Sequence, residues 1–433
     1  MPPKVKGIQS PGGAEKSPRL RGFRARLRTP FQALAHREFR LLWIGQLCQS
    51  SAGFGERVAR SWLALELTGS AFQLGTLELT RGMASLIVGM WGGVLADRID
   101  KRRLLTLIQA WTFACYGAMA ALALSRNLAL WHLYASAVAL SLADAVNQPV
   151  RTAFVPSLVP ENLIINALSL NSVATNATRM GSPITVAALI QWTGSGGWGY
   201  AACAALYVAV IASTRMMNVC EGVARAKSSA VASFLQGWSF VAQNRRVITQ
   251  LVIGTGPLTI GFTYQAMLVA YVKETLGQGA AAYGALYSFA GLGALLGGLA
   301  VASLGTAARG GRMLVAAGLL NGGALLGLGA IGVLPRALPL VAAAAACLML
   351  AGGSQTSFRA ANNGLLLAAT PKELRGRVMS LDGGFRSAGT IIAPLVGALA
   401  DSTSTAAAMA TIGLGSLAMV VGVLAWQPSI RRL

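Results

Sequence analysis

Long apolar stretches, each separated from the next by a short polar segment, recur along the chain after residue 38. A helix needs about 20 mostly apolar residues to cross a bilayer, because its backbone polar groups must be bonded within the segment. Only 12% of the residues are charged, against about 25% in soluble domains. The sequence therefore predicts an all-α membrane protein with twelve transmembrane helices. The predicted spans are residues 39–66, 71–96, 104–125, 129–156, 163–192, 198–217, 247–272, 279–305, 313–333, 337–369, 377–400 and 404–427.

Lysine and arginine are distributed unevenly between the two sides of this predicted bundle. The formal net charge is +22, and most of the cations fall in the N-terminal segment and in the loops that follow the even-numbered spans. The opposite loops hold Arg126, Lys273 and Arg336. Because cytoplasmic loops carry the excess of lysine and arginine, both termini are predicted to be cytoplasmic. The charge reflects topology, so the predicted partner is a lipid bilayer and not nucleic acid.

The spans divide into two halves. The predicted parts are a disordered basic cytoplasmic tail at 1–38, six-helix halves at 39–217 and 247–427, a central cytoplasmic loop at 218–246, and a cytoplasmic tail at 428–433. A shift of 211 residues aligns "VPENLIINALSLNS" (159–172) with "TPKELRGRVMSLDG" (370–383) and places Arg98 on Arg309. An even number of spans per half predicts parallel pseudo-repeats.

Side chains typical of enzymes and metal sites form no recognisable group in the sequence. The five cysteines show neither close pairs nor metal-ligand spacing, and His36 and His132 are far apart. A phosphate-binding loop of the G-x-x-x-x-G-K-[ST] type is absent from the sequence. We therefore expect no enzymatic activity, no metal and no cofactor, and an ion gradient as the source of energy.

The loop between the second and third spans resembles the signature of the major facilitator superfamily, G-x-x-x-D-R/K-x-G-R/K-R/K. The matching residues are Gly93, Asp97, Arg98, Lys101 and Arg102, while Asp100 stands where the pattern has glycine. The stretches "WLALELTGSAFQLG" (62–75) and "NQPVRTAFVPSLVPENLIINALSLNS" (147–172) are similar to one bacterial subgroup, the transmembrane secretion effectors. That subgroup includes enterobactin-type siderophore exporters and macrolide and other drug efflux proteins. The resemblance covers residues 39–427.

The resemblance implies the major facilitator fold and a role for the signature loop. In the superfamily the acid that corresponds to Asp97 holds the two halves together on the cytoplasmic side through a helix terminus and arginine contacts. The signature residues are therefore predicted to form a conformational latch. Local ion pairing in a solvated loop is the alternative interpretation, and it is the one favoured for Asp100.

Charged residues within the predicted spans are costly in a membrane and usually face a wet interior. The pairs Glu56–Arg60 and Asp382–Arg386 are spaced i,i+4, and Glu78–Arg81 is spaced i,i+3, so each pair can neutralise itself along one helix. The nearest cation on the helix of Asp144 is Arg151, two turns away on the same face. Asp144 is therefore expected to lack a close partner.

Two acids are candidates for proton coupling. Glu56 lies in the first span, where related drug exporters often place an acid that faces the central cavity. Asp144 lies near the middle of the fourth span. Spans one, four, seven and ten are expected to line the cavity, as in the superfamily. The candidates for the cavity or substrate site are Gln148, Arg151, Arg179, Tyr264, Gln265, Gln355, Phe358, Arg359 and Asn362. Such a mixture of aromatic, amide and charged groups suits a bulky amphipathic ligand.

Together these features predict a secondary active transporter in a bacterial plasma membrane. The expected activity is efflux of amphipathic small molecules, of the drug or siderophore type, in exchange for protons by alternating access of a monomer. Transport of lysophospholipid is one alternative. A membrane scaffold or sensor that transports nothing is an alternative of another class.

Overall fold

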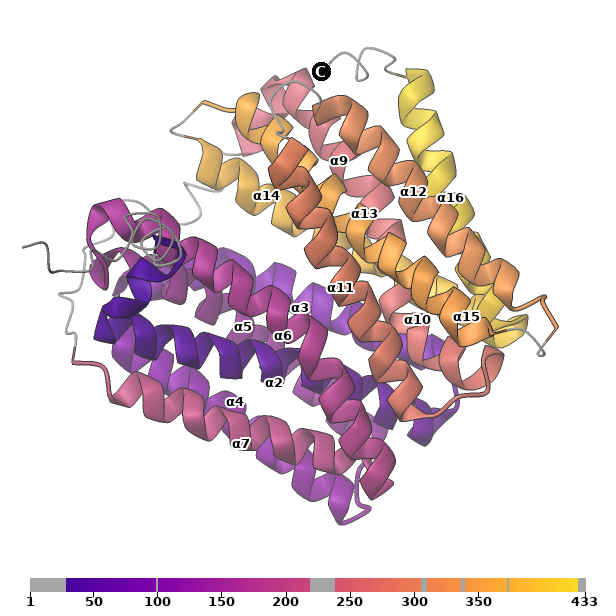
Figure 1. Ribbon diagram of the computed structural model, residues 1–433, viewed down its shortest axis with the longest axis horizontal. Coiled ribbons are helices and arrows are strands. Elements are labelled where there is room, and N and C mark those ends of the chain that lie inside the picture. Colours follow the sequence, from indigo (N-terminus) through magenta and orange to yellow (C-terminus); the bar gives the residue numbers. More distant parts are fainter. Residues whose placement is uncertain are drawn as a thin grey trace, which may run out of the picture.

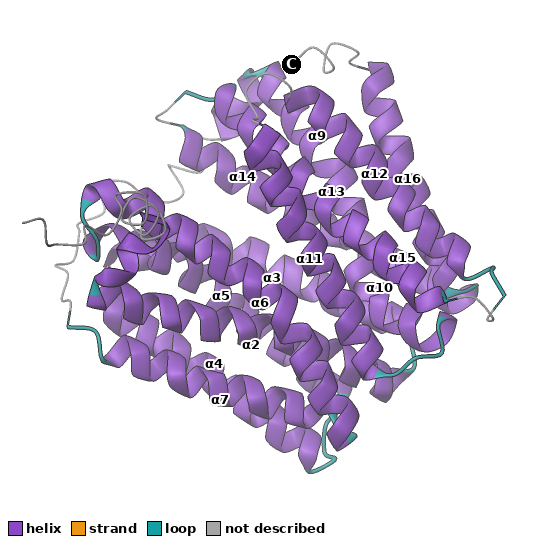
Figure 2. Ribbon diagram, viewed as in Figure 1, coloured by secondary structure: helices purple, strands orange, loops and turns teal. Residues whose placement is uncertain are grey.

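The computed structural model describes residues 29–98, 100–218, 238–304, 310–335, 339–371 and 374–426, and these consist of helices and the short segments that join them (Figure 2). The helices of the N-terminal half are α2 (Arg37–Thr68), α3 (Ala71–Arg98), α4 (Lys101–Leu124), α5 (Leu130–Phe154), α6 (Ile164–Thr193) and α7 (Gly196–Arg215). Those of the C-terminal half are α9 (Arg245–Phe262), α10 (Tyr264–Ala270), α11 (Ala280–Leu304), α12 (Gly310–Ile331), α13 (Leu340–Ala368), α14 (Arg375–Ala388), α15 (Ala393–Ser402) and α16 (Thr405–Trp426). Most of the predicted tail at 1–38, much of the predicted central loop and the C-terminal tail lie outside the described residues.

The boundaries of these helices fall within about one helical turn of the predicted spans. The turns are set by glycine: α2 ends at Gly69, which has φ 61° and donates its N–H to the Leu65 carbonyl over 2.9 Å. Gly194 ends α6 in the same way, with φ 69°. Glycine adopts this left-handed conformation without a steric cost, so α2 and α6 stop sharply at tight connections.

Two of the predicted continuous helices are interrupted in the C-terminal half. The predicted span 247–272 is divided into α9 and α10 and ends in a π turn, Tyr271–Thr275. The predicted span 377–400 is divided into α14 and α15 by a 3-10 turn, Gly389–Ile392. Pro394 lies in the first turn of α15, where its missing N–H costs nothing, whereas it would break a continuous helix.

Eight segments in the described part of the chain are long and apolar enough to cross a membrane. They are α4, α7, α11, α12, α13, α16 and the composite segments Val247–Thr275 and Arg375–Ser402. The helices α2, α3, α5 and α6 have 32, 28, 25 and 30 residues, a sufficient length for about 30 Å of hydrocarbon, but they carry more polar side chains. The count of twelve crossings stays a prediction.

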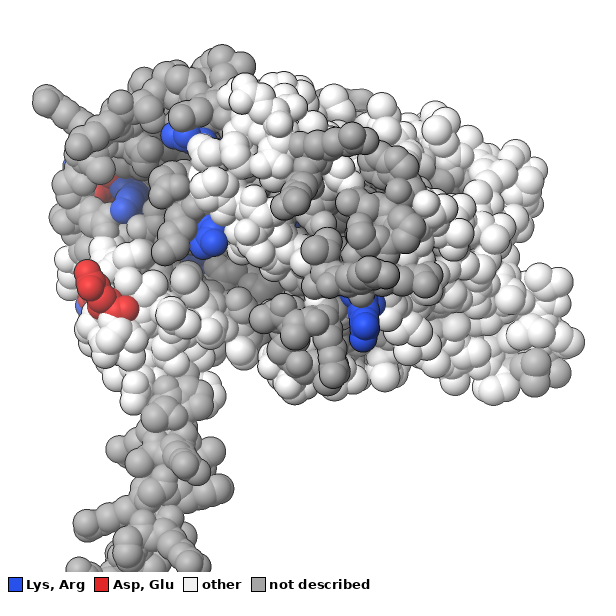
Figure 3. Space-filling model, turned by 90° about the horizontal axis from the view of Figure 1, so that it is seen from above, with Lys and Arg blue, Asp and Glu red and all other residues white. Residues whose placement is uncertain are grey.

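Large apolar side chains lie on the outside of the bundle. Trp192 is 86% exposed and Leu395 is 70% exposed, and Ile165 and Leu107 are similar. Seen from above the view of Figure 1, the described surface is mostly white, with charged side chains in a few places (Figure 3). Lipid is a suitable environment for such a surface, because a soluble protein rarely exposes large continuous apolar patches.

The helices form two bundles that meet along two lines of contact (Figure 1). Within the N-terminal half, α2 packs on α6 and α7, α3 packs on α5, and α4 packs on α5 and α7. Within the C-terminal half, α9 packs on α16, α11 packs on α13, and α12 packs on α13 and α16. Between the halves, α3 packs on α15 and α6 packs on α11. The 211-residue shift maps α3 onto α11 and α6 onto the segment α14–α15, so it relates the α3–α15 contact to the α6–α11 contact. The parallel repeat itself stays a prediction.

Glycine lets the two halves approach closely along these lines. A Cβ atom at Gly75 of α3 would overlap the backbone of Ala393, and one at Gly397 of α15 would overlap the backbone of Ala71. On the other line, a Cβ at Gly284 of α11 would overlap the backbone of Pro183. Small residues of this kind are typical of close helix contacts in membranes.

Candidate functional site

Five charged side chains of three helices form what we call the N-half charge network: Glu56 and Arg60 of α2, Glu78 and Arg81 of α3, and Asp144 of α5. Arg60 lies 3.0 Å from one oxygen of Glu56 and 2.7 Å from Glu78. Arg81 places one nitrogen 2.9 Å from the second oxygen of Glu56 and the other 3.1 Å from Asp144. Three carboxylates thus share two guanidinium groups.

The network extends from the protein interior to an accessible position. The side chains of Glu56 and Arg60 are 1% and 2% exposed, and that of Arg81 is 15% exposed. Asp144 is the most open member, with 53% of its side chain exposed. A buried charge is tolerated only when it is paired and hydrogen-bonded, which explains why Glu56 contacts two arginines.

Of the two ion pairs predicted within single helices of the N-terminal half, one is confirmed. Glu56 and Arg60 do pair along α2. Glu78 and Arg81 do not neutralise each other along α3, because Glu78 contacts Arg60 and Arg81 turns to Glu56 and Asp144. The expectation that Asp144 lacks a close partner is wrong for the same reason: α3 packs on α5 and supplies a cation that spacing along α5 does not reveal.

Arg151 is separate from Asp144, although the two were expected to share one face of the helix. Arg151 is 4% exposed and donates to the Gln49 side chain over 3.0 Å and to the Leu42 carbonyl over 2.7 Å. Both acceptors belong to α2, so Arg151 ties α5 to α2. Gln148 lies on an exposed face of α5.

A second cluster, which we call the C-half polar network, surrounds Asp382 of α14. Asp382 is 0% exposed and forms an ion pair with Arg386, one turn further along the helix, as its i,i+4 spacing predicts. Its other oxygen accepts hydrogen bonds from Thr255 over 3.4 Å and from Asn362 over 3.5 Å. The Asn362 side chain also accepts a bond of 3.0 Å from Gln250. The network therefore ties α14 to α9 and α13.

Two further arginines lie near this network. Arg359 is exposed on α13 and lies within electrostatic range of Arg386, Asp382 and Arg179. Arg179 is half-buried on α6, which belongs to the other half. Neither arginine forms an ion pair with a carboxylate within the ranges that the structure describes.

The other predicted cavity residues are mostly packed. Gln265 accepts a hydrogen bond from Tyr287 over 3.3 Å, and Gln355 donates to the Gly261 carbonyl over 3.2 Å. Tyr264 is 1% exposed, within the main core cluster. Phe358 is also 1% exposed and packs in a smaller core cluster between α12 and α13.

The signature loop is described in part. Gly93, Asp97 and Arg98 belong to α3, but the contacts of their side chains lie outside the described residues, as does the second copy at Arg309. Lys101 donates to the Ala153 carbonyl over 3.1 Å, and Arg102 donates to the Arg215 carbonyl over 2.6 Å. Both contacts lie within the N-terminal half. The local role expected for Asp100 has a direct counterpart, since its side chain caps α4 by accepting the Arg103 N–H over 2.8 Å.

Sequence reasoning gave no functional weight to Arg81, which bridges two of the acids. The available signal was its position one turn after Glu78, but that spacing pointed to the wrong partner. It also missed Asp401, which contacts the opposite half, because a single acid at the end of a span resembles an interfacial residue.

The comparisons with known proteins agree with this architecture. The chain matches the family model of the transmembrane secretion effectors over residues 28–430. It is 25% identical over 361 residues to the enterobactin exporter EntS of Escherichia coli and to that of Shigella boydii, and the match covers 83% of this chain and 83% of each relative. This similarity places the chain beside transporters and not beside enzymes.

Solved structures of transporters share the fold. A POT family transporter in complex with 5-aminolevulinic acid superposes with a TM-score of 0.73 at 14% identity, covering 91% of this chain and 96% of that one. The nucleoside transporter NupG superposes with a TM-score of 0.73 at 11% identity, covering 90% of this chain and 99% of that one. The protein therefore belongs to the transmembrane secretion effector family of the major facilitator superfamily and is a multi-pass membrane transporter.

Proposed function

We propose that this transporter exports amphipathic small molecules in exchange for protons, and that the N-half charge network is its proton site. The observation that carries the proposal is the sharing of Arg81 between the buried Glu56 and the accessible Asp144. Intramembrane charges of this kind usually mark ion or proton pathways. The relation to an enterobactin exporter supports the outward direction of transport.

Proton uptake at Asp144 changes the network in a defined way. While both acids are ionised, each holds one nitrogen of Arg81. A proton on Asp144 removes its charge and weakens its bond to Arg81, because hydrogen bonds between charged groups are roughly twice as strong as neutral ones. Arg81 then remains with Glu56, and the tie between α3 and α5 loosens. Since α3 also packs on α15, the proton acts on a helix at the boundary between the halves.

The proposed orientation follows the distribution of lysine and arginine. Both termini lie in the cytoplasm of a bacterium and the chain spans its inner membrane, so the end where α2 meets α3 faces outward. Alternating access is then a movement of the two halves about the α3–α15 and α6–α11 contacts. The protein works as a monomer in this proposal, and the cytoplasmic latch is formed by Gly93, Asp97, Arg98, Lys101 and Arg102.

The proposed substrate is amphipathic and of the siderophore or drug type. Arg359 and Arg179 favour an anionic group, whereas Glu56 and Asp144 favour a cationic one. The name of the relative, enterobactin exporter, supports the siderophore class. The side chains proposed to contact substrate are those that are exposed or half-buried, Gln148, Arg179, Gln265 and Arg359. The other predicted residues, Arg151, Tyr264, Gln355, Phe358 and Asn362, are buried and are proposed to support this surface from behind.

The test is an accumulation assay in efflux-deficient bacterial cells with a panel of dyes, antibiotics and a catecholate siderophore. Cells without the protein are compared with cells that carry the wild type, Asp144→Asn or Glu56→Gln, each with and without a protonophore. The matched control is Glu66→Gln, which removes an exposed carboxylate bonded to Trp62 of its own helix. The amount of folded protein in the membrane is measured in every strain.

We expect the wild type and Glu66→Gln to lower the accumulation of at least one compound, the protonophore to abolish this effect, and Asp144→Asn to lack it. If no compound responds while the protein is folded, export of this class is wrong, and lysophospholipid movement between leaflets is tested next. A scaffold or sensor would instead keep its function in both acid variants and lose it on deletion of residues 1–38.

A further inference from the structure

We propose that Asp401 and Gln191 form a two-point clasp that joins the halves at the end where α2 meets α3, and that this clasp must release before the transporter opens on that side. The proposal rests on the alternating access proposed above. It assigns a positioning role to two residues that do not belong to either buried network.

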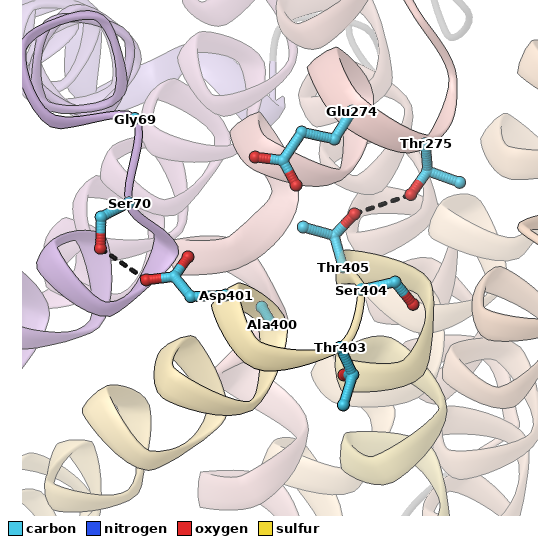
Figure 4. A pocket seen from close by; sticks show the side chains of 9 residues that line it. All are labelled: Gly69, Ser70, Glu274, Thr275, Ala400, Asp401, Thr403, Ser404 and Thr405. Carbon is cyan, nitrogen blue, oxygen red and sulfur yellow. Dashed lines mark hydrogen bonds between the residues drawn. The ribbon is translucent and has the colours of Figure 1, made fainter.

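The first point of the clasp is a carboxylate of one half that caps a helix of the other half. Asp401, near the end of α15, accepts a hydrogen bond of 2.5 Å from the Ser70 hydroxyl (Figure 4). It also accepts bonds from the Ala71 N–H over 2.6 Å and from the Phe72 N–H over 3.0 Å. The first N–H groups of a helix have no partner within it, and the helix dipole favours a negative charge there. The start of α3 thus receives its cap from the opposite half.

The second point is a single, longer hydrogen bond at the corresponding place on the other line of contact. Gln191, near the end of α6, accepts a hydrogen bond of 3.4 Å from the Ala281 N–H at the start of α11. The 211-residue shift places Ser70 on Ala281 and Asp401 on Ile190, next to Gln191. Each half therefore caps the first turn of a helix of its partner half at pseudo-equivalent positions, once with a carboxylate and once with an amide.

The surroundings of Asp401 make the first point releasable. A cavity of about 470 Å³ opens beside it and is lined by Gly69, Ser70, Glu274, Thr275, Ala400, Asp401, Thr403, Ser404 and Thr405. Glu274 faces Asp401 from the π turn after α10 and repels it (Figure 4). Both carboxylates are exposed, so water competes with the helix N–H groups for the Asp401 oxygens. A helix cap buried within one half would face neither competition from water nor repulsion by a neighbouring carboxylate.

The inference is tested by measuring the distance between the halves, which requires no knowledge of the substrate. Spin labels are attached to cysteines at Asn127, between α4 and α5, and at Val333, after α12, in a background whose five native cysteines are replaced. Double electron–electron resonance is recorded on the full-length protein in lipid nanodiscs. The variants are Asp401→Ala, Asp401→Asn, Gln191→Ala and the double variant Asp401→Ala/Gln191→Ala, with Glu66→Gln as the control.

We expect Asp401→Ala to raise the ratio of long to short distances by about tenfold or more, because it removes three hydrogen bonds to a charged group. Asp401→Asn has a smaller effect, since an amide oxygen still accepts, and the double variant has the largest. Glu66→Gln matches the wild type. Wild-type distance distributions in both Asp401→Asn and the double variant overturn the proposal. Ser70→Ala, which removes the 2.5 Å bond alone, replaces Asp401→Ala if that variant does not fold.

The result separates this inference from the proposed function. Longer distances in the clasp variants combined with no export of any compound by the wild type keep the clasp and reject the export proposal. Unchanged distances combined with protonophore-sensitive export reject the clasp alone.

Discussion

The guanidinium group of Arg81 lies 3.1 Å from the carboxylate of Asp144, although the two residues stand on different helices, 63 positions apart. This contact joins the accessible end of the N-half charge network to its buried part. It is the contact that protonation of a single carboxylate changes most directly.

Asp144→Asn is expected to abolish proton-driven transport and to leave folding nearly intact. The asparagine oxygen still accepts a bond from Arg81, but the side chain cannot exchange a proton. Because the aspartate is half exposed, its loss lowers the free energy of unfolding by less than about 1 kcal/mol. Transport into proteoliposomes driven by a pH gradient, together with the midpoint of thermal unfolding, measures both effects. Wild-type transport by this variant would rule out Asp144 as the proton site.

Glu56→Gln is expected to destabilise the fold much more strongly. Arg60 keeps Glu78 and Arg81 keeps Asp144, but both lose their charged partner Glu56 in the interior, at a cost of about 1.5–3 kcal/mol for each bond. Combining Glu56→Gln with Arg81→Gln removes one of these charges and is expected to restore part of the stability. A double-mutant cycle on thermal unfolding in detergent gives the coupling between the two sites. Additive effects would show that the contact of 2.9 Å carries no stability.

Arg151→Lys is expected to destabilise the N-terminal half, although the substitution keeps the positive charge. A lysine ammonium cannot reach Gln49 and the Leu42 carbonyl in the planar geometry of a guanidinium group. The loss of one buried hydrogen bond from a charged donor costs about 1.5–3 kcal/mol. Arg179→Lys serves as the comparison, because Arg179 is only half-buried. Equal unfolding midpoints for the two variants would contradict the tie between α5 and α2.

Asp382→Asn tests whether proton coupling belongs to the N-half charge network or to the C-half polar network. The variant keeps an oxygen that accepts from Thr255 and Asn362 but loses the ion pair with Arg386, which is 25% exposed and can be solvated. We expect a moderate loss of stability and an unchanged ratio of protons to substrate, since the proposed proton site lies in the other half. The stoichiometry is read from the reversal potential of transport in proteoliposomes. A changed ratio would move proton coupling to the C-terminal half.

Gly397→Ala is expected to weaken the contact between the halves. The new Cβ atom meets the backbone of Ala71 and Phe72, which cannot move aside as a flexible side chain would. The α3–α15 contact must widen, and the distance between labels at Asn127 and Val333 increases. Gly422→Ala on α16 is the control, because a Cβ atom there meets nothing within 4 Å. An unchanged distance between the two labels in Gly397→Ala would show that the α3–α15 contact has room for an additional methyl group.

The positions of the helices were largely predictable, because a long apolar run bounded by glycine or by charge determines where a membrane helix begins and ends. The break before Tyr264 was not, since it lies inside an apolar run of ordinary length, whereas Pro394 was a signal in the sequence for the break at Gly389–Ile392. Packing against another helix contributes to the second break: a Cβ atom at Gly389 would overlap Thr259 of α9.

Ion pairs with i,i+4 spacing in one helix were predictable, whereas the i,i+3 pair Glu78–Arg81 and the pairs between helices were not. The i,i+4 spacing identified Glu56–Arg60 and Asp382–Arg386, because the geometry of a single helix places those side chains together. The partners of Arg81 and Asp401 depend on which helices pack side by side and on their rotation, and a single sequence specifies neither.

The glycines of the α3–α15 contact also affect how two packed helices slide past each other. Interdigitated side chains resist sliding, because each step requires several of them to change rotamer together. At Gly75 and Gly397 the opposing surfaces are backbone, so no side chain stands in the way at these two positions. The α3–α15 contact therefore lacks interlocking side chains at these positions, as the proposed movement of the two halves requires.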